Sequence, residues 1–334
     1  MLNNKQLVSE IEQYMLPFLD NEQLEQLHII LSAKLNLNEQ SPNKNSKGQT
    51  EDGNADTMLN NFISAKRVEG CSDKTLKFYS STLRKAFSKI EKKNIKKITT
   101  EDLRKYLDNY ADSSRAGKVT IDNMRRILSS FFNWLEEENY IIKSPVKRIH
   151  KVRTGKTVKA TFTDDMLEQM RDACSTKRDL AIVDLLSSSG MRVGELVHLN
   201  RDDINFETRE CIVFGKGSKE RRVYFDARTK LHLEKYLESR NDDNPALFTS
   251  LNKANKRLQI PGIEIMIRKL GKSCGISKVH PHKFRRTLAT MAIGKGMPVE
   301  QVQHLLGHAS IETTMQYAMV NEDNVKLSHQ KYLA

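Results

Sequence analysis

Several basic side chains in the second half of the chain have types and spacings suited to binding and attacking a phosphodiester. His282 and Arg285 are three residues apart, so on a helix they lie on one face. Arg192 follows Gly190, where one helix is expected to end and another to begin. A guanidinium binds phosphate bidentately and keeps its proton, so Arg192 and Arg285 together could hold two non-bridging oxygens. Each of these residues alone is common in a basic protein, so the signal depends on the rest of the set.

A lysine, a histidine and a tyrosine complete this set. Lys216 lies in the segment 215–218, between two short apolar runs that predict a β-hairpin. His308 ends a Leu-Leu-Gly-His segment, and Tyr317 follows nine residues later. A phenol with an ordinary pKa near 10 needs a base and nearby cations before it can attack at neutral pH. Tyr317 is therefore the candidate nucleophile, although a tyrosine in a helix is more often a core aromatic.

Neither a metal site nor a nucleotide-binding loop is predicted. The histidines of this region could suggest zinc, but no cysteine or acidic partner lies at the spacing of a zinc finger from them: His280, His282, His304 and His308. The chain also has no G-x-x-x-x-G-K-[ST] segment. The prediction is an enzyme without metal or cofactor.

In order and spacing, these elements resemble the tyrosine recombinases, and most closely the Xer and phage-integrase branch. The matching segments are Arg192 in G-x-R-x-x-E, Lys216 in G-K-G-x-K-x-R, His282-x-x-Arg285, Leu-Leu-Gly-His308 and Tyr317. The resemblance covers about residues 57–334, with the specific motifs in 188–317. It implies the following roles: phosphate binding by Arg192, Arg285 and His308, protonation of the leaving 5′ oxygen by Lys216, acid–base work by His282, and nucleophilic attack by Tyr317.

Residues close to these motifs raise further expectations. Glu195 and Asp203 match family positions that support the arginines. Lys219 shares the hairpin with Lys216 and is its rival for the general-acid role. Arg286 stands where many family members have a second histidine, and we interpret it as a tolerated variant. Two more arginines beside the hairpin are expected to contact the DNA backbone: Arg221 and Arg222.

The resemblance implies a site-specific DNA recombinase that works through a 3′-phosphotyrosine intermediate and a Holliday junction, without metal or ATP. The expected partner is double-stranded DNA, bound by a homo-tetramer on two recombination sites, with accessory DNA-bending or directionality proteins as further partners. Integration and excision of a mobile element, inversion and resolution all stay open as its task. Two other classes also stay open: a type IB topoisomerase-like enzyme, which shares the residue chemistry, and a catalytically silent DNA-binding protein.

These residues need a scaffold, and the hydrophobic periodicity predicts a mainly α-helical chain with a small antiparallel β-sheet. The resemblance implies a helical core-binding domain with a SAM-like fold and a tyrosine-recombinase catalytic domain, which form a C-shaped clamp. The expected organisation is an N-terminal helical segment at 1–37, a flexible linker at 38–56, the core-binding domain at 57–150, a linker at 151–159, the catalytic domain at 160–320, and a C-terminal tail at 321–334 that packs on a neighbouring protomer.

The charge distribution favours a polyanionic partner. The chain has a net charge of +13. Residues 1–55 contain four lysines, no arginine and eight acidic residues, a net charge of −4, so the remaining residues carry +17. Basic side chains between the apolar helix faces of the core-binding domain predict a phosphate-contacting surface: Lys66, Arg67, Lys74, Lys77, Arg84, Lys85, Lys92, Lys93, Lys96 and Lys97.

Other features limit the class of protein. No run of eighteen apolar residues occurs, so no membrane span is predicted. The first residues lack the pattern of a signal peptide, and the four cysteines show no C-x-x-C spacing. We therefore expect a cytoplasmic protein with reduced thiols.

The N-terminal segment carries two apolar stripes. One runs through Leu7, Ile11 and Met15, and the other through Leu24, Leu27, Leu31 and Leu35. An acidic segment is unsuited to gripping DNA, so the stripes predict helix packing between protomers or onto an accessory protein. A self-contained hairpin without a partner is the alternative.

Overall fold

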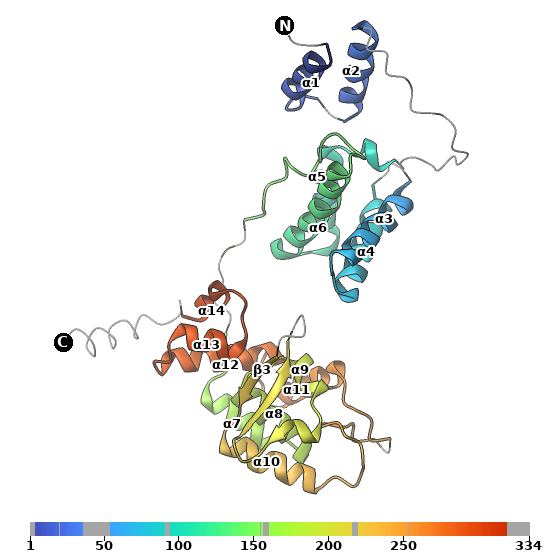
Figure 1. The fold of residues 1–334 in the computed structure, drawn as a ribbon. Coiled ribbons are helices and arrows are strands. Elements are labelled where there is room, and N and C mark those ends of the chain that lie inside the picture. Colours follow the sequence, from blue (N-terminus) through green and yellow to red (C-terminus); the bar gives the residue numbers. More distant parts are fainter. Residues whose placement is uncertain are drawn as a thin grey trace, which may run out of the picture. The chain divides into compact units, whose positions relative to one another are not determined.

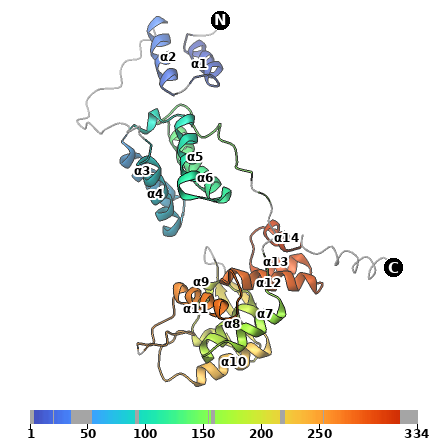
Figure 2. The same ribbon diagram turned by 180° about the vertical axis from the view of Figure 1, so that it is seen from behind.

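The computed structural model describes residues 4–19, 21–35, 54–90, 94–153, 155, 160–215, 220–252 and 254–318. The chain divides into two compact units, residues 1–156 and 157–334, drawn in Figure 1 and from behind in Figure 2. The expected linkers at 38–56 and 151–159 lie largely outside the described residues, and the tail at 321–334 lies wholly outside them. The finer domain boundaries and the packing of the tail stay predictions.

The first unit is built from helices around an aromatic core. Its elements are α1 (Asn4–Met15), α2 (Asn21–Lys34), α3 (Ala55–Val68), α4 (Asp73–Phe87), the 3-10 turn η1 (Ile95–Lys97), α5 (Thr100–Ser114) and α6 (Lys118–Glu137). Phe62 of α3 and Phe131 of α6 are fully buried, with ring centroids 5.3 Å apart and nearly perpendicular planes. Trp134 joins them, 5.6 Å from Phe62. Edge-to-face contacts of this kind stabilise a core beyond the apolar area that they bury.

Local sequence signals set the helix boundaries in this unit. Thr99 and Asp102 form a capping box at the start of α5. The Asp102 N–H donates to Thr99 Oγ1 (3.3 Å), and the Thr99 N–H donates to Asp102 Oδ2 (2.8 Å). This capping box fixes the start of the helix. Helix α6 buries one apolar stripe: Met124, Leu128, Phe131 and Leu135.

The N-terminal helices form a hairpin against their own unit. Val8 of α1 and Leu24 of α2 are buried, and Glu12 Oε1 lies 2.6 Å from His28 Nδ1. The Asn21 side chain accepts from the Lys143 N–H (2.8 Å) and donates to the Lys143 carbonyl (2.9 Å). The two helices therefore pack on each other and on the rest of the first unit. Packing onto another protomer or an accessory protein stays a prediction.

The second unit combines helices with an antiparallel sheet whose described strands lie in the order β1-β2-β3. The strands are β1 (Ile204–Asn205), β2 (Glu210–Phe214) and β3 (Glu220–Tyr224), and the helical elements are α7 (Asp164–Asp172), α8 (Lys177–Ser189), α9 (Val193–His198), η2 (Arg201–Asp203), α10 (Ala227–Glu238), α11 (Ile260–Ser273), α12 (Pro281–Gly294), α13 (Val299–Leu306) and α14 (Ile311–Ala318). The predicted hairpin is confirmed as β2 and β3, with Phe214 opposite Glu220. Its turn, residues 216–219, lies outside the described residues.

Helix α8 lies at the centre of the second unit. Its Ile182, Leu185 and Leu186 are fully buried, and it packs against α10, α12 and β3. Helices α12, α13 and α14 pack on one another at one end of the unit, with α10 at the opposite end (Figures 1 and 2). The mainly helical fold with a small antiparallel sheet is thus confirmed. The segments with His282 and Arg285, Leu-Leu-Gly-His308 and Tyr317 belong to α12, the end of α13 and α14.

Two further expectations can be compared with the structure. No helix in the described part of the chain is long and apolar enough to cross a membrane. The four cysteines are free thiols. Burial raises the pKa of Cys174 and of Cys211 to about 12, so these two stay protonated and poorly nucleophilic at neutral pH.

Candidate active site

The C-terminal end of α13 presents a row of backbone carbonyls. Gly307 ends this helix with a φ of 62°, in the left-handed region. The N–H groups of Gly307 and His308 return to the carbonyls of His304 (3.0 Å) and Gln303 (3.1 Å). The next carbonyls, at 305–307, have no partner within the helix and carry the partial negative charge of its end. They therefore favour cationic donors.

Arginines from separate parts of the chain occupy this row. Arg221 comes from β3, Arg285 from α12, and Arg192 directly precedes α9. The bonds are Arg221 Nη1 to Leu305 O (3.0 Å), Arg285 Nη2 to Leu306 O, and Arg192 Nη2 to Gly307 O (3.2 Å). The Leu-Leu-Gly-His motif is thus an acceptor row that brings three guanidinium groups together.

Arg285 is the most deeply placed of the three. Arg285 is only 4% exposed, and its Nη1 also donates to the Gly190 carbonyl at the end of α8 (2.8 Å). Burial, with the charges of Arg192 and Arg221, lowers the pKa of Arg285 to about 10, so it remains a cation at neutral pH. No carboxylate among the described residues forms an ion pair with it. This charge is held by carbonyls and left available to an anion.

Glu195 holds the other two arginines. Its buried carboxylate accepts from Arg192 Nη1 through Oε1 (2.9 Å) and from Arg221 Nη2 through Oε2 (2.5 Å). The Arg192 N–H also donates to Oε2 (2.7 Å). One carboxylate facing three arginines leaves a net charge of +2. The expected support of Arg192 by Glu195 is seen, and the cluster as a whole suits a phosphate.

His308 and Tyr317 lie beside this cluster. His308 Nδ1 is 2.8 Å from Thr314 Oγ1, and its ring centroid is 6.1 Å from that of Tyr317. Burial first, and then Arg285 and the other two arginines, lower the pKa of His308 to about 4. The imidazole is therefore neutral at pH 7. Tyr317 packs against the small apolar cluster of α12 and α13 and lies within electrostatic range of Arg285.

The other residues expected in or near the site are His282, Lys216, Lys219 and Asp203. His282 is exposed in the first turn of α12, one turn before Arg285. Lys216 and Lys219 lie outside the described residues, so the structure does not test their roles. Asp203 caps the turn η2 by accepting from the Asn200 N–H (2.7 Å). Among the described residues, no cluster of histidine, cysteine and carboxylate side chains could hold a metal ion.

Known families and proteins match this chain in sequence. Residues 160–324 match the Phage integrase family, and residues 58–142 match the Phage integrase N-terminal SAM-like domain. Tyrosine recombinase XerC of Staphylococcus aureus is 31% identical over 281 residues, which cover 79% of this chain and 92% of the relative. The chain belongs to the tyrosine recombinase family. It is a tyrosine site-specific recombinase, which decides against a topoisomerase-like enzyme.

Solved structures share the fold of this recombinase. XerH site-specific recombinase, bound to a palindromic difH substrate in a post-cleavage complex, is 20% identical with a TM-score of 0.65, covering 98% of this chain and 95% of that chain. A lambda integrase tetramer bound to a Holliday junction is 21% identical with a TM-score of 0.65, covering 87% and 88%. The match to the SAM-like domain also confirms the predicted type of the first unit.

The basic surface predicted on this SAM-like domain is only partly available to DNA. Lys66 forms an ion pair with Glu69 (2.7 Å), and Arg84 forms one with Asp56 (2.5 Å). Two more of its members, at 92 and 93, lie outside the described residues. Exposed ion pairs of this kind are weak, so these side chains can exchange a carboxylate for a phosphate. The surface itself stays a prediction.

Arg221 is the residue of the recombinase site that sequence reasoning missed. Its side chain is only 11% exposed and is committed to Glu195 and Leu305, which does not fit the expected backbone-contacting role. A side chain added at Gly307 would meet Arg221 Cδ at 2.6 Å, so glycine is required there by both the φ angle and this contact. One signal could have found it: Arg221 shares the inward face of β3 with the buried Val223.

We expect Arg221→Lys to slow DNA cleavage by about 10–100-fold while duplex binding changes little, because an ammonium cannot hold Glu195 and Leu305 in one planar fork. Arg222→Lys is the matched control, since Arg222 is exposed on the opposite face of β3 and pairs with Glu210. Single-turnover cleavage and gel-shift binding would be compared for both. Equal rates for the two variants would show that Arg221 does not position the site.

The depressed pKa of His308 predicts a pH-dependent contribution to stability. In the unfolded chain this histidine takes up a proton near pH 6.5, but in the folded chain only near pH 4. Stability is therefore fully present above pH 6.5 and is lost as the pH falls toward 4. We expect His308→Gln to lose less free energy of unfolding than the parent between pH 7 and 4. Urea unfolding followed by circular dichroism measures this, and equal losses would contradict it.

Proposed function

We propose that this recombinase exchanges strands of double-stranded DNA through a covalent bond between Tyr317 and a 3′ phosphate. The observation that carries the proposal is the convergence of Arg192, Arg221 and Arg285 on the end of α13, beside His308 and Tyr317. A net charge of +2 in a partly buried cluster favours one phosphodiester and the extra negative charge that builds on it during displacement.

The proposed chemistry balances without a cofactor. The Tyr317 oxygen attacks phosphorus and gives up its proton, with His282 as the acid–base group. The bond from phosphorus to the 5′ oxygen breaks, and Lys216 supplies the proton that this oxygen takes up. One phosphodiester replaces another, so a 5′ hydroxyl can reverse the reaction without ATP. Arg192, Arg285 and His308 bind the phosphate throughout, while Arg221 and Glu195 hold Arg192 in position.

His308 is proposed to bind a proton more readily once DNA is bound. It is neutral at pH 7 in the free protein, because burial and three arginines disfavour its charged form. A bound phosphodiester adds negative charge to the site and opposes the arginines, so it raises the affinity of His308 for a proton. His308 then donates a hydrogen bond to the phosphate from the nitrogen that does not face Thr314.

We also propose a homo-tetramer on two recombination sites, with a Holliday junction as the intermediate. The support is the fold shared with the lambda integrase tetramer. The two units are proposed to enclose the duplex as a clamp, with the basic surface of the first unit toward phosphates. Integration and excision, inversion, and resolution are all compatible with this assembly, as are accessory DNA-bending or directionality proteins.

A suicide substrate tests the proposal. A nick just 3′ of the cleavage site makes the fragment that leaves with the 5′ hydroxyl short enough to diffuse away, so the covalent complex accumulates. We expect a denaturation-resistant protein–DNA complex in excess EDTA and without nucleotide, with the DNA 3′ phosphate mapped to the peptide that contains Tyr317. Strict dependence on a divalent metal, or attachment through a 5′ phosphate, would reject this mechanism. Duplex binding with no adduct would favour the catalytically silent alternative.

A further inference from the structure

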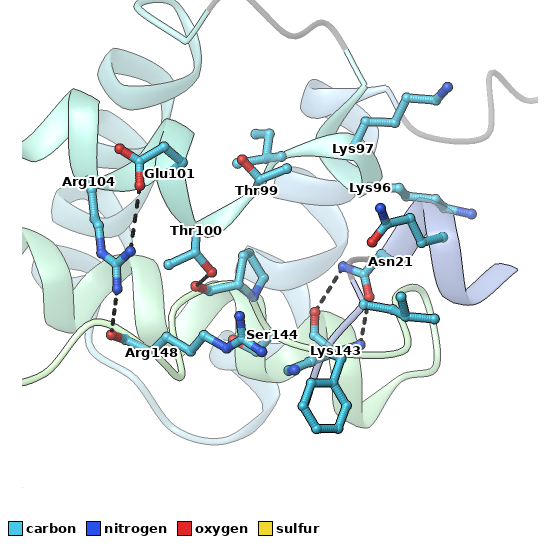
Figure 3. A pocket seen from close by; sticks show the side chains of 15 residues that line it. Asn21, Lys96, Lys97, Thr99, Thr100, Glu101, Arg104, Lys143, Ser144 and Arg148 are labelled. Carbon is cyan, nitrogen blue, oxygen red and sulfur yellow. Dashed lines mark hydrogen bonds and ion pairs between the residues drawn. The ribbon is translucent and has the colours of Figure 1, made fainter. Parts of the chain in front are cut away.

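The first unit contains a pocket of about 340 Å³ between the N-terminal hairpin and the helices of the SAM-like domain (Figure 3). Phe18 and Asn21 line it from the hairpin, and the start of α5 and the segment 143–148 line it from the domain. Cations predominate among the lining residues. They are Lys96, Lys97, Arg104, Lys143 and Arg148, whereas Glu101 is the one carboxylate among the described residues that line the pocket. The composition of the pocket therefore favours an anion.

A buried hydroxyl in the wall of this pocket has no partner. Ser144 is only 1% exposed, and its side chain lines the pocket (Figure 3). Its N–H donates to Glu136 Oε2 (3.3 Å), but its Oγ makes no hydrogen bond within the part of the chain that the structure describes. A buried hydroxyl left unpaired costs free energy. An oxygen-rich ligand in the pocket would supply the missing acceptor.

The helix α5 adds backbone donors to the same wall. Its capping box uses the N–H groups of Thr99 and Asp102, so those of Thr100 and Glu101 have no partner within the helix. Both residues line the pocket. The N-terminus of a fifteen-residue helix favours negative charge and binds phosphate through such N–H groups.

Two arginines of this pocket differ in their partners. Arg104 is paired with Glu101 (3.5 Å), but Arg148 forms no ion pair with any described carboxylate. Lys143 Nζ donates to the Leu16 carbonyl at the end of α1. Burial, and then the charges of Arg148 and Lys147, lower the pKa of Lys143. An anion here would relieve the repulsion among these cations and strengthen the contact that holds the hairpin.

We propose that this pocket binds a free phosphate group, inorganic or monoester, through Arg148, Ser144 and the first N–H groups of α5, and that the bound phosphate fastens the N-terminal hairpin to the SAM-like domain. A DNA backbone would offer the same phosphate chemistry. The hairpin disfavours it, because the segment 4–34, part of which lines the pocket, contains two lysines and five acids, a net charge of −3. The inference does not depend on the proposed catalytic mechanism.

The only tryptophan of the chain makes the test specific to this unit. Trp134 lies in the core of the first unit, so its fluorescence reports the unfolding of that unit alone. Thermal unfolding of the full chain would be followed at 295 nm excitation, with sodium phosphate titrated against sodium chloride at constant ionic strength. We expect the midpoint to rise with phosphate in a saturable way, because a ligand bound only to the folded state stabilises it by mass action.

Two variants and one control test whether phosphate binds in this pocket. Arg148→Gln should weaken phosphate binding by about tenfold, the usual effect of removing one charge-assisted contact, and Ser144→Ala should weaken it several-fold. Arg126→Gln removes one exposed arginine from α6, outside the pocket, and should leave the titration unchanged. No saturable rise in the parent, or equal titrations for Arg148→Gln and Arg126→Gln, would overturn the proposal. If the parent does not respond to phosphate and Arg148→Gln binds duplex DNA more weakly than the parent, the pocket binds the DNA backbone and the proposal also fails.

Discussion

The recombinase with Tyr317→Phe is expected to bind its duplex site as tightly as the parent and to form no covalent protein–DNA adduct. The change removes one hydroxyl and leaves Arg192, Arg221, Arg285 and their carbonyl partners in place, so the phosphate site keeps its charge. Without the phenol oxygen there is no nucleophile to form the phosphotyrosine. Gel shift measures the binding, and a denaturing gel of the suicide-substrate reaction measures the adduct.

Tyr224→Phe is the matched control for this loss. Tyr224 lies in the same unit but is exposed on β3, away from the α12–α14 cluster that holds Tyr317. Its hydroxyl should be dispensable for adduct formation. An adduct that persists in Tyr317→Phe would mean that another side chain attacks, and the central assignment would fail. Loss of duplex binding in Tyr317→Phe would instead point to a structural role for the hydroxyl.

The second large effect is expected at Lys216. If its ammonium protonates the leaving 5′ oxygen, Lys216→Ala should cleave an ordinary substrate more slowly by a factor on the order of 10²–10⁴. A substrate with sulfur in place of the bridging 5′ oxygen has a leaving group that needs no proton, so it should recover most of the rate. Single-turnover cleavage of the two substrates by parent and variant gives the comparison.

Lys219→Ala is the control for Lys216→Ala, because both lysines lie in the segment between β2 and β3 and carry the same charge. It should slow both substrates alike or neither. A sulfur rescue found for Lys219→Ala and absent for Lys216→Ala would move the general-acid role to Lys219. Arg221 is close in sequence to both lysines. It lies opposite Val213 in the register of β2 and β3, and its side chain joins β3 to the end of α13.

The amino-acid sequence by itself determined the parts of this recombinase that depend on near neighbours along the chain. Gly190 and Gly307 end helices in the left-handed region, and Thr99 begins one, because caps act within one turn. The spacing of His282 and Arg285 placed both on one helix for the same reason. The hairpin around Lys216 followed from alternating apolar residues and a glycine-containing turn. The resemblance then supplied roles for these positions.

The tertiary structure alone decided what joins them. The sequence does not say that three arginines from β3, α12 and the start of α9 share the carbonyls of 305–307, or that Glu195 bridges Arg192 and Arg221. Nor does it show that Arg286, which stays interpreted as a tolerated variant, donates from Nη2 to the Ala160 carbonyl near the start of the second unit. Nor does it show that the acidic N-terminal hairpin closes a basic pocket at Lys143. Each of these contacts joins residues tens of positions apart, and such pairs form only where packing of the whole unit brings distant helix ends and strands together, which no local pattern encodes.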